Sequence, residues 1–545
     1  MKNLPLSIQN LNEIIQGNYL YVDKTYLFPE LIQNKQLFLS RPRRFGKSLL
    51  LDSLDELFRG NADLFSGLKI AQSGYQFKKY PVIRLSMTGD CSSPELLKKG
   101  LINKLEDIVK PYHNLSLRSV EPGEALKRLI EDISEECGER VVTLIDEYDY
   151  PVSHYIDNPP LAKANTEVLS SFYVIFKEVD KLLRFVMVTG LTRYAMMGLS
   201  AGLNQLVDIS FNPKYAAICG FTPDELDQYF SDRYGSVLEA LKSTDYLPAE
   251  SSEADLRQEI LDWYDGYTWV GKTQVLNPIS ILNFFNESEF KEFWKNNSIS
   301  INFLQNTISS NPFSFTKNNL QGYVESDLSL ATVGQLAPVP LLFHTGYLTI
   351  DKIIRVRKKI QYSFRVPNFE LKDAFNDILL SSISSILTID KNKEYKSLNK
   401  AIKDQDGPEL TRIIKAVFSR IPAKHYGKQL ISEYFFHDVL LGYFFGLVAE
   451  VRPEEPGALG DPDLILVTFE GIHAVIEIKY AKSEGRADLE EALDQLARQG
   501  LRVIKEKKYG ETYRLAGHEF VTIGLGVIGR GEAKAVFGDH QKDLA

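Results

Sequence analysis

The sequence predicts an α/β protein with a parallel sheet in its N-terminal part, a helical extension after it, and a smaller α/β domain at the C-terminus. Through the first 220 residues, apolar runs of strand length alternate with longer helical patterns, which is typical of a parallel sheet covered by helices. From about residue 212 to 300 the pattern is helical and rich in aromatic residues. The last block has the pattern helix, strand, strand, helix, strand.

These changes of pattern divide the chain into four predicted segments. They are the sheet domain (residues 1–212), a helical lid or extension (213–300), a mixed connector (301–425) and the C-terminal α/β domain (426–545). The predicted strands of the sheet are residues 36–40, 80–87, 140–146, 184–189 and 216–221. Several are apolar throughout, as central strands of a parallel sheet are when both faces are buried.

Smaller signals place further elements. Thr222, followed three residues later by Glu225, predicts a capped helix start in the extension. Residues 346–362 of the connector form a β segment that contains the basic run RVRKK. In the last domain, VRPEEPGALGDPD (residues 451–463) carries the turn residues of a long loop between the first helix and the first strand.

Composition restricts the class of protein. The chain of 545 residues carries 63 Lys and Arg against 72 Asp and Glu, a net charge of -9, so a nucleic-acid site must be a local basic groove. Cys91, Cys137 and Cys219 lie far apart, which argues against a disulfide framework and a zinc site. With no leader pattern and no apolar run long enough for a bilayer, we expect a soluble cytoplasmic protein without a membrane partner.

A phosphate-binding loop follows the first predicted strand. Residues 41–48 match the pattern GxxxxGK[ST], except that Arg41 occupies the position of the first glycine. Gly46 lets backbone N–H groups approach phosphates, Lys47 reaches the β and γ oxygens, and the Ser48 hydroxyl coordinates magnesium. The residues expected to contact nucleotide here are Arg43, Arg44, Phe45, Gly46, Lys47 and Ser48. Taken alone, GKS also occurs by chance at a helix start.

An acidic strand end supplies the partner of this loop. RVVTLIDEYD ends in Asp146 and Glu147, the positions of a magnesium-binding Asp and a water-activating Glu in nucleoside triphosphatases. Thr189 ends a further strand, where its hydroxyl could sense the γ-phosphate between the loop and the acidic strand. Arg193 could complete that site, although an Arg after a strand is more often a surface residue. Asp23 and Lys24, in YLYVDKT, either close over the nucleotide or form a solvated pair.

A second constellation lies near the C-terminus, in GDPDLILVTFEGIHAVIEIKYA. Glu477 and Lys479 are two apart on a predicted strand and therefore share a face. If residues 469–471 make a three-residue hairpin loop with Gly471 in the left-handed conformation, Asp463 lies directly opposite Glu477. A two-residue loop would place the two carboxylates on opposite faces.

The three-residue loop would gather two ligands for a hard cation and one base. That set suits metal-assisted phosphodiester hydrolysis, with Asp463 and Glu477 as metal ligands and Lys479 positioning or activating water. A third carboxylate could come from the preceding helix, where Glu433 and His437 are four apart. An ordinary half-buried hairpin with its end charges facing water carries the same short pattern.

Taken together, the motifs resemble the bacterial AAA-ATPase-like family whose members end in a PD-(D/E)XK nuclease domain. The resemblance covers nearly the whole chain, and RPRRFGKS, with its arginine, is specific to that family. It rests on YLYVDKT (19–25), RPRRFGKSL (41–49), LIDEYD (144–149), TGLTR (189–193), WYDGY (263–267), NPIS (277–280), HTGYLT (344–349), SEYFFH (432–437) and the PD and EIK elements.

The resemblance implies an AAA-like P-loop fold, a restriction-endonuclease-like fold, and a role for each matching residue. Lys47 and Ser48 would bind phosphate and magnesium, and Asp146 and Glu147 would form the acidic pair. The nuclease set would be Glu433, Asp463, Glu477 and Lys479. The family usually has a Gln in the following helix. In this sequence Val503 occupies the position where the family has that Gln, while Gln495 and Gln499 lie one to two helical turns earlier.

The favoured hypothesis is an ATPase that uses ATP and magnesium, or manganese in its place, to control a nuclease acting on nucleic acid, with DNA favoured over RNA. Self-assembly into a homo-oligomer is compatible with the resemblance. An alternative is a nucleotide-dependent switch whose nuclease-like domain grips nucleic acid or protein without cutting. A third hypothesis is a signalling ATPase with a structural tail. The basic runs at residues 355–359 and 505–508 are either phosphate contacts or solvated charge.

Overall fold

The structure is a computed structural model. It describes residues 1–112, 114–193, 205–294, 320–328, 338–372, 391–419, 433–444, 447–448, 450–453, 462–468, 470–482, 488–509, 513, 515 and 517–538. The chain forms two compact units, the first comprising Met1–Phe303 with Gln321–Lys372 and the second comprising Leu304–Leu320 with Asp373–Ala545. The predicted connector, residues 301–425, therefore contributes to both units.

A five-stranded parallel sheet is the centre of the first unit. Its strands are β1 (Gln36–Ser40), β2 (Val82–Ser86), β3 (Val141–Asp146), β4 (Leu183–Gly190) and β5 (Val207–Asp208). They lie in the order β2-β3-β4-β1-β5, so β4 lies between β1 and β3. β1 and β3 are buried along their whole length, which explains their continuous apolar runs. The first four strands confirm the prediction.

The fifth predicted strand, residues 216–221, is wrong. This apolar run follows the 3-10 helix η5 (Pro213–Tyr215) as a largely buried turn. The reason is Gly220, which adopts φ +91° and donates its N–H to the Phe45 carbonyl at 3.1 Å. The run thereby packs against the phosphate-binding loop, and β5 takes the place at the edge of the sheet.

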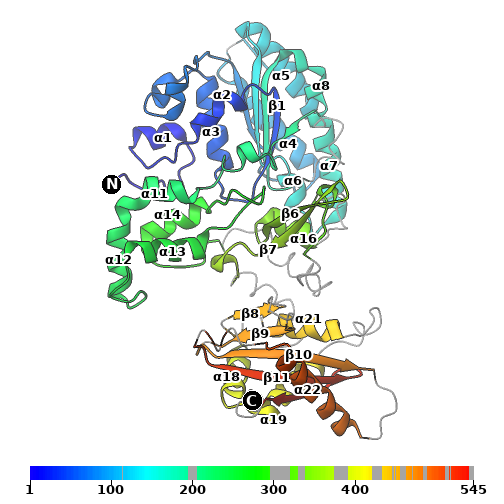
Figure 1. The fold of residues 1–545 in the computed structure, drawn as a ribbon. Helices are drawn as coiled ribbons and strands as arrows, with labels where there is room; N and C mark the ends of the chain where they lie inside the picture. Colours follow the sequence, from blue (N-terminus) through cyan, green and yellow to red (C-terminus); the bar gives the residue numbers. More distant parts are fainter. Residues whose placement is uncertain are drawn as a thin grey trace. The chain divides into compact units, whose positions relative to one another are not determined.

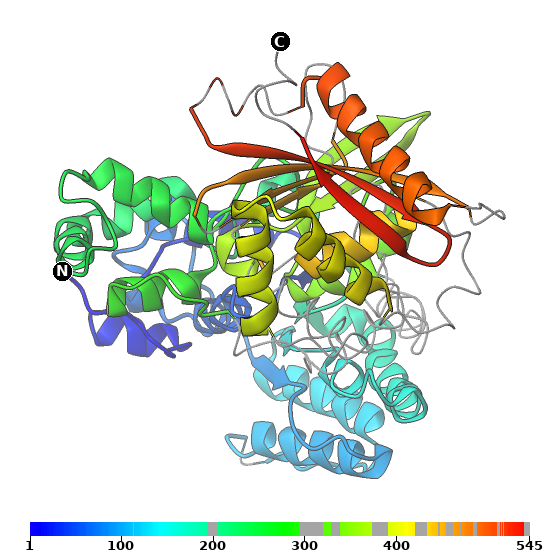
Figure 2. The ribbon, with the colours of Figure 1, turned by 90° about the horizontal axis from the view of Figure 1, so that it is seen from below.

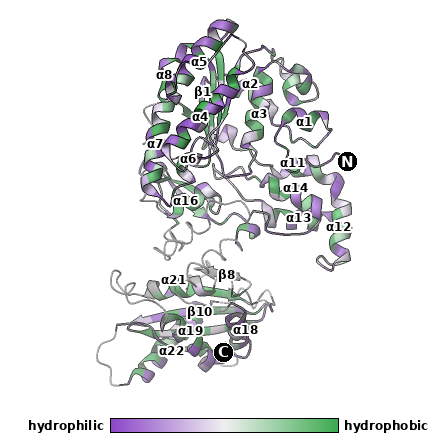
Figure 3. Cartoon of the chain, turned by 180° about the vertical axis from the view of Figure 1, so that it is seen from behind, coloured by the Kyte–Doolittle hydropathy of each residue, from purple (hydrophilic) through white to green (hydrophobic). Residues whose placement is uncertain are grey.

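Helices cover both faces of this sheet (Figure 1). One layer holds α1 (Leu11–Gln16), α2 (Phe28–Leu31) and α3 (Lys47–Phe58). The other holds α4 (Pro94–Val109), α5 (Pro122–Cys137), α6 (Tyr150–Ser153), α7 (Pro159–Tyr173) and α8 (Ile175–Glu178). Helices of both units carry hydrophilic and hydrophobic residues together (Figure 3), as amphipathic helices packed on a sheet do.

The helical extension forms a hydrophobic core to which Val22 of the N-terminal segment also contributes. Its helices are α11 (Pro223–Phe230), α12 (Tyr234–Ser243), α13 (Glu253–Tyr264) and α14 (Pro278–Glu287). The predicted capped start is confirmed, since the Thr222 hydroxyl accepts from Glu225 N and the Glu225 carboxylate accepts from Thr222 N. The unit continues through α16 (Pro338–Thr345) into a hairpin of β6 (Thr349–Val356) and β7 (Lys359–Arg365), which is the predicted β segment.

The second unit is built on a mixed five-stranded sheet in the order β12-β11-β10-β9-β8. Its strands are β8 (Glu450–Pro453), β9 (Leu464–Val467), β10 (His473–Ala481), β11 (Phe520–Ile528) and β12 (Glu532–Phe537). The pair β10–β11 is parallel and the other pairs are antiparallel. The predicted order helix, strand, strand, helix, strand corresponds to α21, β9, β10, α22 and β11. Two further strands were not predicted, namely β8, which runs into the stretch expected to be a loop, and β12.

Helices lie on opposite faces of this second sheet, with α18 (Lys391–Lys403) and α19 (Gly407–Ser419) on one face and α22 (Leu489–Glu506) on the other (Figure 2). α21 (Glu433–Phe444) joins the core of α18 and α19. Ile476 and Ile478 of β10 belong to that core, while Val475 packs with Ile504 of α22. Because successive strand residues alternate in direction, Glu477 and Lys479 lie on the α22 face.

Candidate functional site

The loop after β1 turns directly into α3. Gly46 is the N-cap of α3 at φ +92°, a left-handed conformation that glycine adopts without a steric penalty. Arg44, two residues earlier, is also left-handed, at φ +64°. The turn leaves the first N–H groups of a twelve-residue helix at the loop, which is the arrangement that binds phosphate.

Lys47 and Ser48 are held by the protein itself. The buried Lys47 Nζ donates to the carbonyl oxygens of Arg41 and Pro42, each at 2.9 Å, and burial lowers the pKa of this lysine. The Ser48 hydroxyl donates to Asp146 Oδ2 at 2.6 Å. The structure thus brings the loop and the acidic strand into direct contact.

Asp146 is the centre of this site. Its Oδ1 accepts from the Thr189 hydroxyl at 2.7 Å and from Glu147 N at 2.9 Å. The contact with Thr189 arises because β4 lies between β1 and β3. Glu147 adopts φ +50°, which is rare for a non-glycine residue, and burial followed by the neighbouring Asp146 raises its pKa. Such strained backbone gathers at functional sites.

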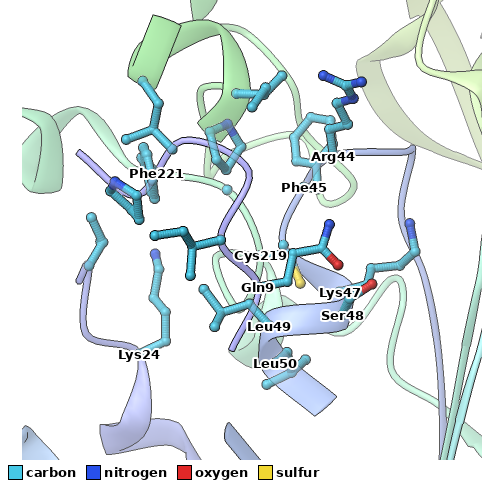
Figure 4. Close-up of a pocket in the computed structure, with 18 of the residues that line it drawn as sticks. Gln9, Lys24, Arg44, Phe45, Lys47, Ser48, Leu49, Leu50, Cys219 and Phe221 are labelled. Carbon is cyan, nitrogen blue, oxygen red and sulfur yellow. The ribbon is translucent and has the colours of Figure 1, made fainter. Parts of the chain in front are cut away.

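Lys47, Ser48 and Glu147 line a pocket of about 570 Å³, a volume within the usual range of small-molecule sites. Its lining includes the polar side chains of Ser7, Gln9, Tyr21, Lys24, Arg43, Arg44, Lys47, Ser48, Glu147 and Tyr150. Figure 4 shows Lys24, Phe221 and Cys219 on the walls of the same hollow as Lys47 and Ser48. The apolar part, which includes Phe45 and Leu282, would suit a flat base, and the basic part would suit phosphates.

Arg193 has partners of its own. Its guanidinium pairs with Asp208 at 2.7 Å and with Glu325 at 2.9 Å, and lies 4.8 Å from the ring centre of Phe211. None of these three partners belongs to the phosphate-binding loop. The role of Arg193 as a nucleotide sensor stays a prediction.

Two residues near the loop, Arg41 and Asp149, have structural roles that the motifs did not indicate. The buried Arg41 donates to the carbonyl oxygens of Ser40, Ser210 and Tyr215 and lies 4.0 Å from the ring centre of Trp269. It therefore replaces the first glycine of the pattern with an internal brace. Asp149, the last residue of LIDEYD, accepts from Leu191 N and from Thr192 N and Oγ1, which fixes the segment after β4.

Asp23 and Lys24 are both buried, so the alternative of a solvated pair is wrong. Lys24 pairs with Glu225 of the helical extension and also lines the pocket, and burial lowers its pKa. Asp23 accepts from Thr25 N at 2.8 Å and from Lys69 N at 2.6 Å. The sequence DKT drew attention to Asp23 and Lys24, but the ion pair could not be predicted because Glu225 is 201 residues from Lys24 along the chain.

In the second unit, the hairpin has the register predicted from a three-residue loop. Gly471 adopts φ +84°, and Thr468 N donates to Ile472 O at 2.9 Å. Leu464 pairs with Ile476, so Asp463 comes next opposite Glu477. Asp463 Oδ2 accepts from Ile478 N at 2.7 Å, which draws its carboxylate toward β10.

Glu477 and Lys479 lie beside Asp463. Lys479 Nζ donates to Glu477 Oε1 at 3.1 Å and to Ile478 O at 2.9 Å. The Glu477 side chain is 8% exposed, and its Oε2 has no hydrogen-bond partner within the described part of the chain. Burial, with the charge of Asp463 second, raises the pKa of Glu477 to about 7. A buried carboxylate oxygen with no donor suits a hard cation.

The other predicted nuclease residues divide into three cases. α21 begins at Glu433, whose side chain lies outside the described residues. His437 Nε2 is 2.9 Å from the carbonyl oxygen of Asp463, so it buttresses the PD element. Gln495 and Gln499 are exposed on α22, and Val503 is half-buried. Gly500 lies between them on the inner face, where a Cβ would come within 2.8 Å of the Glu477 carbonyl.

The described side chains include no group of three or more His, Cys, Asp or Glu residues placed to hold a metal ion. Asp463 and Glu477 provide two carboxylates, and the oxygen of Glu477 that lacks a donor fits a cation between them. Elsewhere, Ser48 and Asp146 are the residues that would hold magnesium beside a nucleotide. Within the described ranges, none of the helices is long and apolar enough to cross a bilayer.

Two family models match separate parts of the chain, and a known protein is similar to nearly all of it. The model of the family described as predicted AAA-ATPase matches residues 5–200, and that of the PD-(D/E)XK nuclease superfamily matches residues 431–534. The relative named "Uncharacterized protein in vnfD 5'region", from Azotobacter chroococcum mcd 1, is 32% identical over 534 residues, covering 96% of each chain.

A solved structure of the Aeropyrum pernix ORC1 protein in complex with DNA covers 64% of this chain and 89% of that one, at 12% identity and a TM-score of 0.22. The two family models and the full-length relative decide the assignment, in agreement with the fold of each unit. The chain belongs to the AAA-ATPase-like family whose members carry a C-terminal PD-(D/E)XK nuclease domain.

Proposed function

We propose that this protein binds and hydrolyses ATP and uses the nucleotide to control a magnesium-dependent nuclease that cuts DNA. The observation that carries the nuclease part is the buried Glu477 Oε2, which has no donor among the described residues and lies beside Asp463 and Lys479. A solvated hairpin end would not bury this oxygen, because burying a carboxylate oxygen without a hydrogen-bond donor costs free energy.

For the ATPase part, the chain supplies one side chain for each requirement of phosphoryl transfer. Lys47 would exchange its two carbonyl partners for phosphate oxygens, which it reaches from the start of α3. Glu147 lines the pocket next to Asp146, where it would orient a water molecule and accept its proton. Thr189, bonded to Asp146, would respond to the γ-phosphate through that carboxylate.

For the nuclease part, Asp463 and Glu477 would hold magnesium, or manganese in its place. When bound, that ion supplies Lewis-acid polarisation of the scissile phosphate and a lowered pKa of its water. The ammonium group of Lys479, with its Nζ 3.1 Å from Glu477 Oε1, would orient the attacking water or stabilise the charge on the phosphate. The Asp463 carboxylate is fixed by Ile478 N, so the set is organised before a substrate binds.

The test uses full-length protein with supercoiled and linear DNA, in magnesium or manganese, with and without ATP. Lys479→Ala should abolish cleavage, and Lys47→Ala should abolish ATP hydrolysis and alter cleavage. Lys482→Ala, which removes an exposed lysine from the end of the same hairpin, is the matched control and should cut normally.

A second candidate function is a nucleotide-dependent switch that grips nucleic acid or protein without cutting. The exposed positions of Gln495 and Gln499 on α22 favour it, because neither side chain joins Glu477 and Lys479 in the described structure. ATP hydrolysis by the wild type with no cleavage in either metal would replace the nuclease proposal with this one.

A further inference from the structure

The β6–β7 hairpin of the first unit is a two-stranded ribbon with an exposed, uniformly basic end. All side chains from residue 351 to 360 are exposed. Between Lys352 and Lys359 the ribbon has no acidic residue and carries five basic ones, namely Lys352, Arg355, Arg357, Lys358 and Lys359. Within the described part of the chain none of the five forms an ion pair, although the whole protein has a net charge of -9.

The turn at the end of the ribbon presents two of these charges. Val356 pairs with Lys359, so Arg357 and Lys358 are the two loop residues. Their φ angles are +46° and +75°, the pattern of a type I′ turn. Such turns strongly favour Asn-Gly, because most side chains are strained in the left-handed region. Arg357 and Lys358 therefore occupy positions whose left-handed backbone conformation disfavours long side chains.

Aliphatic side chains accompany the charges. Ile354 is 50% exposed, Ile360 42% and Val356 41%. Ile354 and Val356 project from the face that also carries Lys352 and Lys359, because residues two apart share a face. In a ribbon with no binding partner, we would expect these aliphatic side chains to be buried or to be polar.

The base of the ribbon is firmly attached to the first unit. Tyr362 is buried, lies 5.8 Å from the ring centre of Phe211, and forms a bridge with Tyr323. Thr349 Oγ1 donates to Thr268 O at 3.0 Å and accepts from Thr268 N at 2.7 Å. The exposed end therefore projects from a fixed base and can present its charges in one geometry.

We propose that the β6–β7 ribbon binds duplex DNA, with its basic turn and edges on the phosphates and its aliphatic face against the groove. The charge of the ribbon complements DNA, and the major groove of the duplex admits a two-stranded β-ribbon. Residues 351–360 contain no aromatic side chain, so the stacking platform of single-strand binders is absent from this segment. The major groove of duplex RNA is too narrow for side chains to read.

This inference rests on the proposed function, in that DNA is the substrate, and it assigns a DNA contact to the ATPase unit. The decisive variant is Arg357→Asn/Lys358→Gly, made in the Lys479→Ala protein so that no DNA is cut. Asn-Gly is the preferred sequence for this turn, so the variant removes two charges while relieving the backbone. Its melting temperature and its ATP hydrolysis without DNA should not fall, which separates lost binding from misfolding.

Binding is measured by the anisotropy of a short labelled duplex over a series of salt concentrations. We expect the variant to raise Kd about tenfold and to make the slope of log K against log salt shallower by about 2, roughly one unit for each lost phosphate contact. Ile354→Ser/Val356→Ser should weaken binding with an unchanged slope. Lys99→Gln/Lys163→Gln, which removes two exposed lysines from α4 and α7, is the charge-matched control and should bind as the parent does.

An unchanged Kd and slope in the turn variant would overturn the inference alone, because DNA cleavage by protein with Lys479 intact would still stand. If the parent does not bind the duplex even at low salt, both the inference and DNA as the substrate fall. Binding of the parent to anionic phospholipid vesicles, lost in the turn variant, together with unchanged DNA binding, would overturn the inference in favour of a membrane surface.

Discussion

Asp146 and Glu477 are the buried carboxylates at the centres of the two sites, and the protein satisfies them very differently. Asp146 accepts hydrogen bonds on both oxygens, from Ser48 on one and from Thr189 and Glu147 N on the other. Glu477 accepts from Lys479 on Oε1, while its Oε2 has no partner within the described part of the chain.

The difference teaches how each site is prepared for its ligand. In the first unit, a nucleotide and its metal would have to displace hydrogen bonds that already exist, including those from Lys47 to Arg41 O and Pro42 O. We expect that exchange to couple ligand binding to the strands, because the displaced groups are hydrogen-bonded to residues of β3 and β4. In the nuclease unit, a cation would fill a place that is already polar and unsatisfied. Ligand binding at the first site would therefore replace existing hydrogen bonds, whereas cation binding at the second would supply a missing partner to Glu477.

The largest effect that would test this comparison is expected from Glu477→Gln. The amide keeps the shape of the side chain but is a poor ligand for a hard cation, so we expect cleavage to fall about a thousandfold. Because it also removes a buried ionisable group, metal-free stability at neutral pH should not fall. The measurement pairs a plasmid cleavage assay with a melting curve in chelator.

Asp146→Asn is the counterpart in the other unit. The amide has one oxygen to serve the donors that now use two, so this variant should lose both ATP hydrolysis and about 1–3 kcal/mol of stability. If the two variants changed stability alike, the contrast between a satisfied and an unsatisfied carboxylate would be wrong.

The next largest effect is expected from Arg41→Gly, which restores the common P-loop pattern. The change removes the donor to the carbonyl oxygens of Ser40, Ser210 and Tyr215 and empties the space beside Trp269. We expect a loss of about 3–5 kcal/mol in unfolding free energy, together with weaker nucleotide binding.

The control for Arg41→Gly is Arg128→Ala, which breaks an exposed pair with Glu124 on α5 and should cost less than about 0.5 kcal/mol. Denaturant unfolding of both variants gives the comparison. A stable Arg41→Gly protein with normal nucleotide affinity would show that the loop does not depend on this brace.

The sequence carried enough information for features set by local patterns. The position of Asp146 followed from an apolar strand that ends in two carboxylates. The hairpin register followed once the loop had three residues with Gly471 in the left-handed conformation, although a two-residue loop was also compatible with the sequence. Arg41 could not be understood in this way, because its partner Ser210 is 169 residues away and Trp269 is more distant still. Residues 216–221 misled for the same reason, since their burial comes from a turn held by the Phe45 carbonyl and not from a strand.

The smallest effect is on pH dependence, which follows from the Glu477 pKa of about 7, raised from 4.5 by burial. Below that pH the folded protein keeps the carboxyl group neutral, and a neutral carboxyl binds a cation poorly. Cleavage at low metal concentration should therefore rise up to about tenfold per pH unit and level off above about pH 7. More metal should move the midpoint to lower pH, because metal binding displaces the proton.

The sign for stability is the opposite. A carboxyl with a raised folded pKa binds its proton more tightly in the folded state than in the unfolded one. The metal-free nuclease unit should therefore lose stability as pH rises from about 4.5 to about 7. Glu477→Gln should flatten that part of the melting profile, and added magnesium should reverse the loss in the wild type only. Identical profiles for wild type and Glu477→Gln would mean that Glu477 ionises as an ordinary surface carboxylate, which would remove the distinction between the two sites.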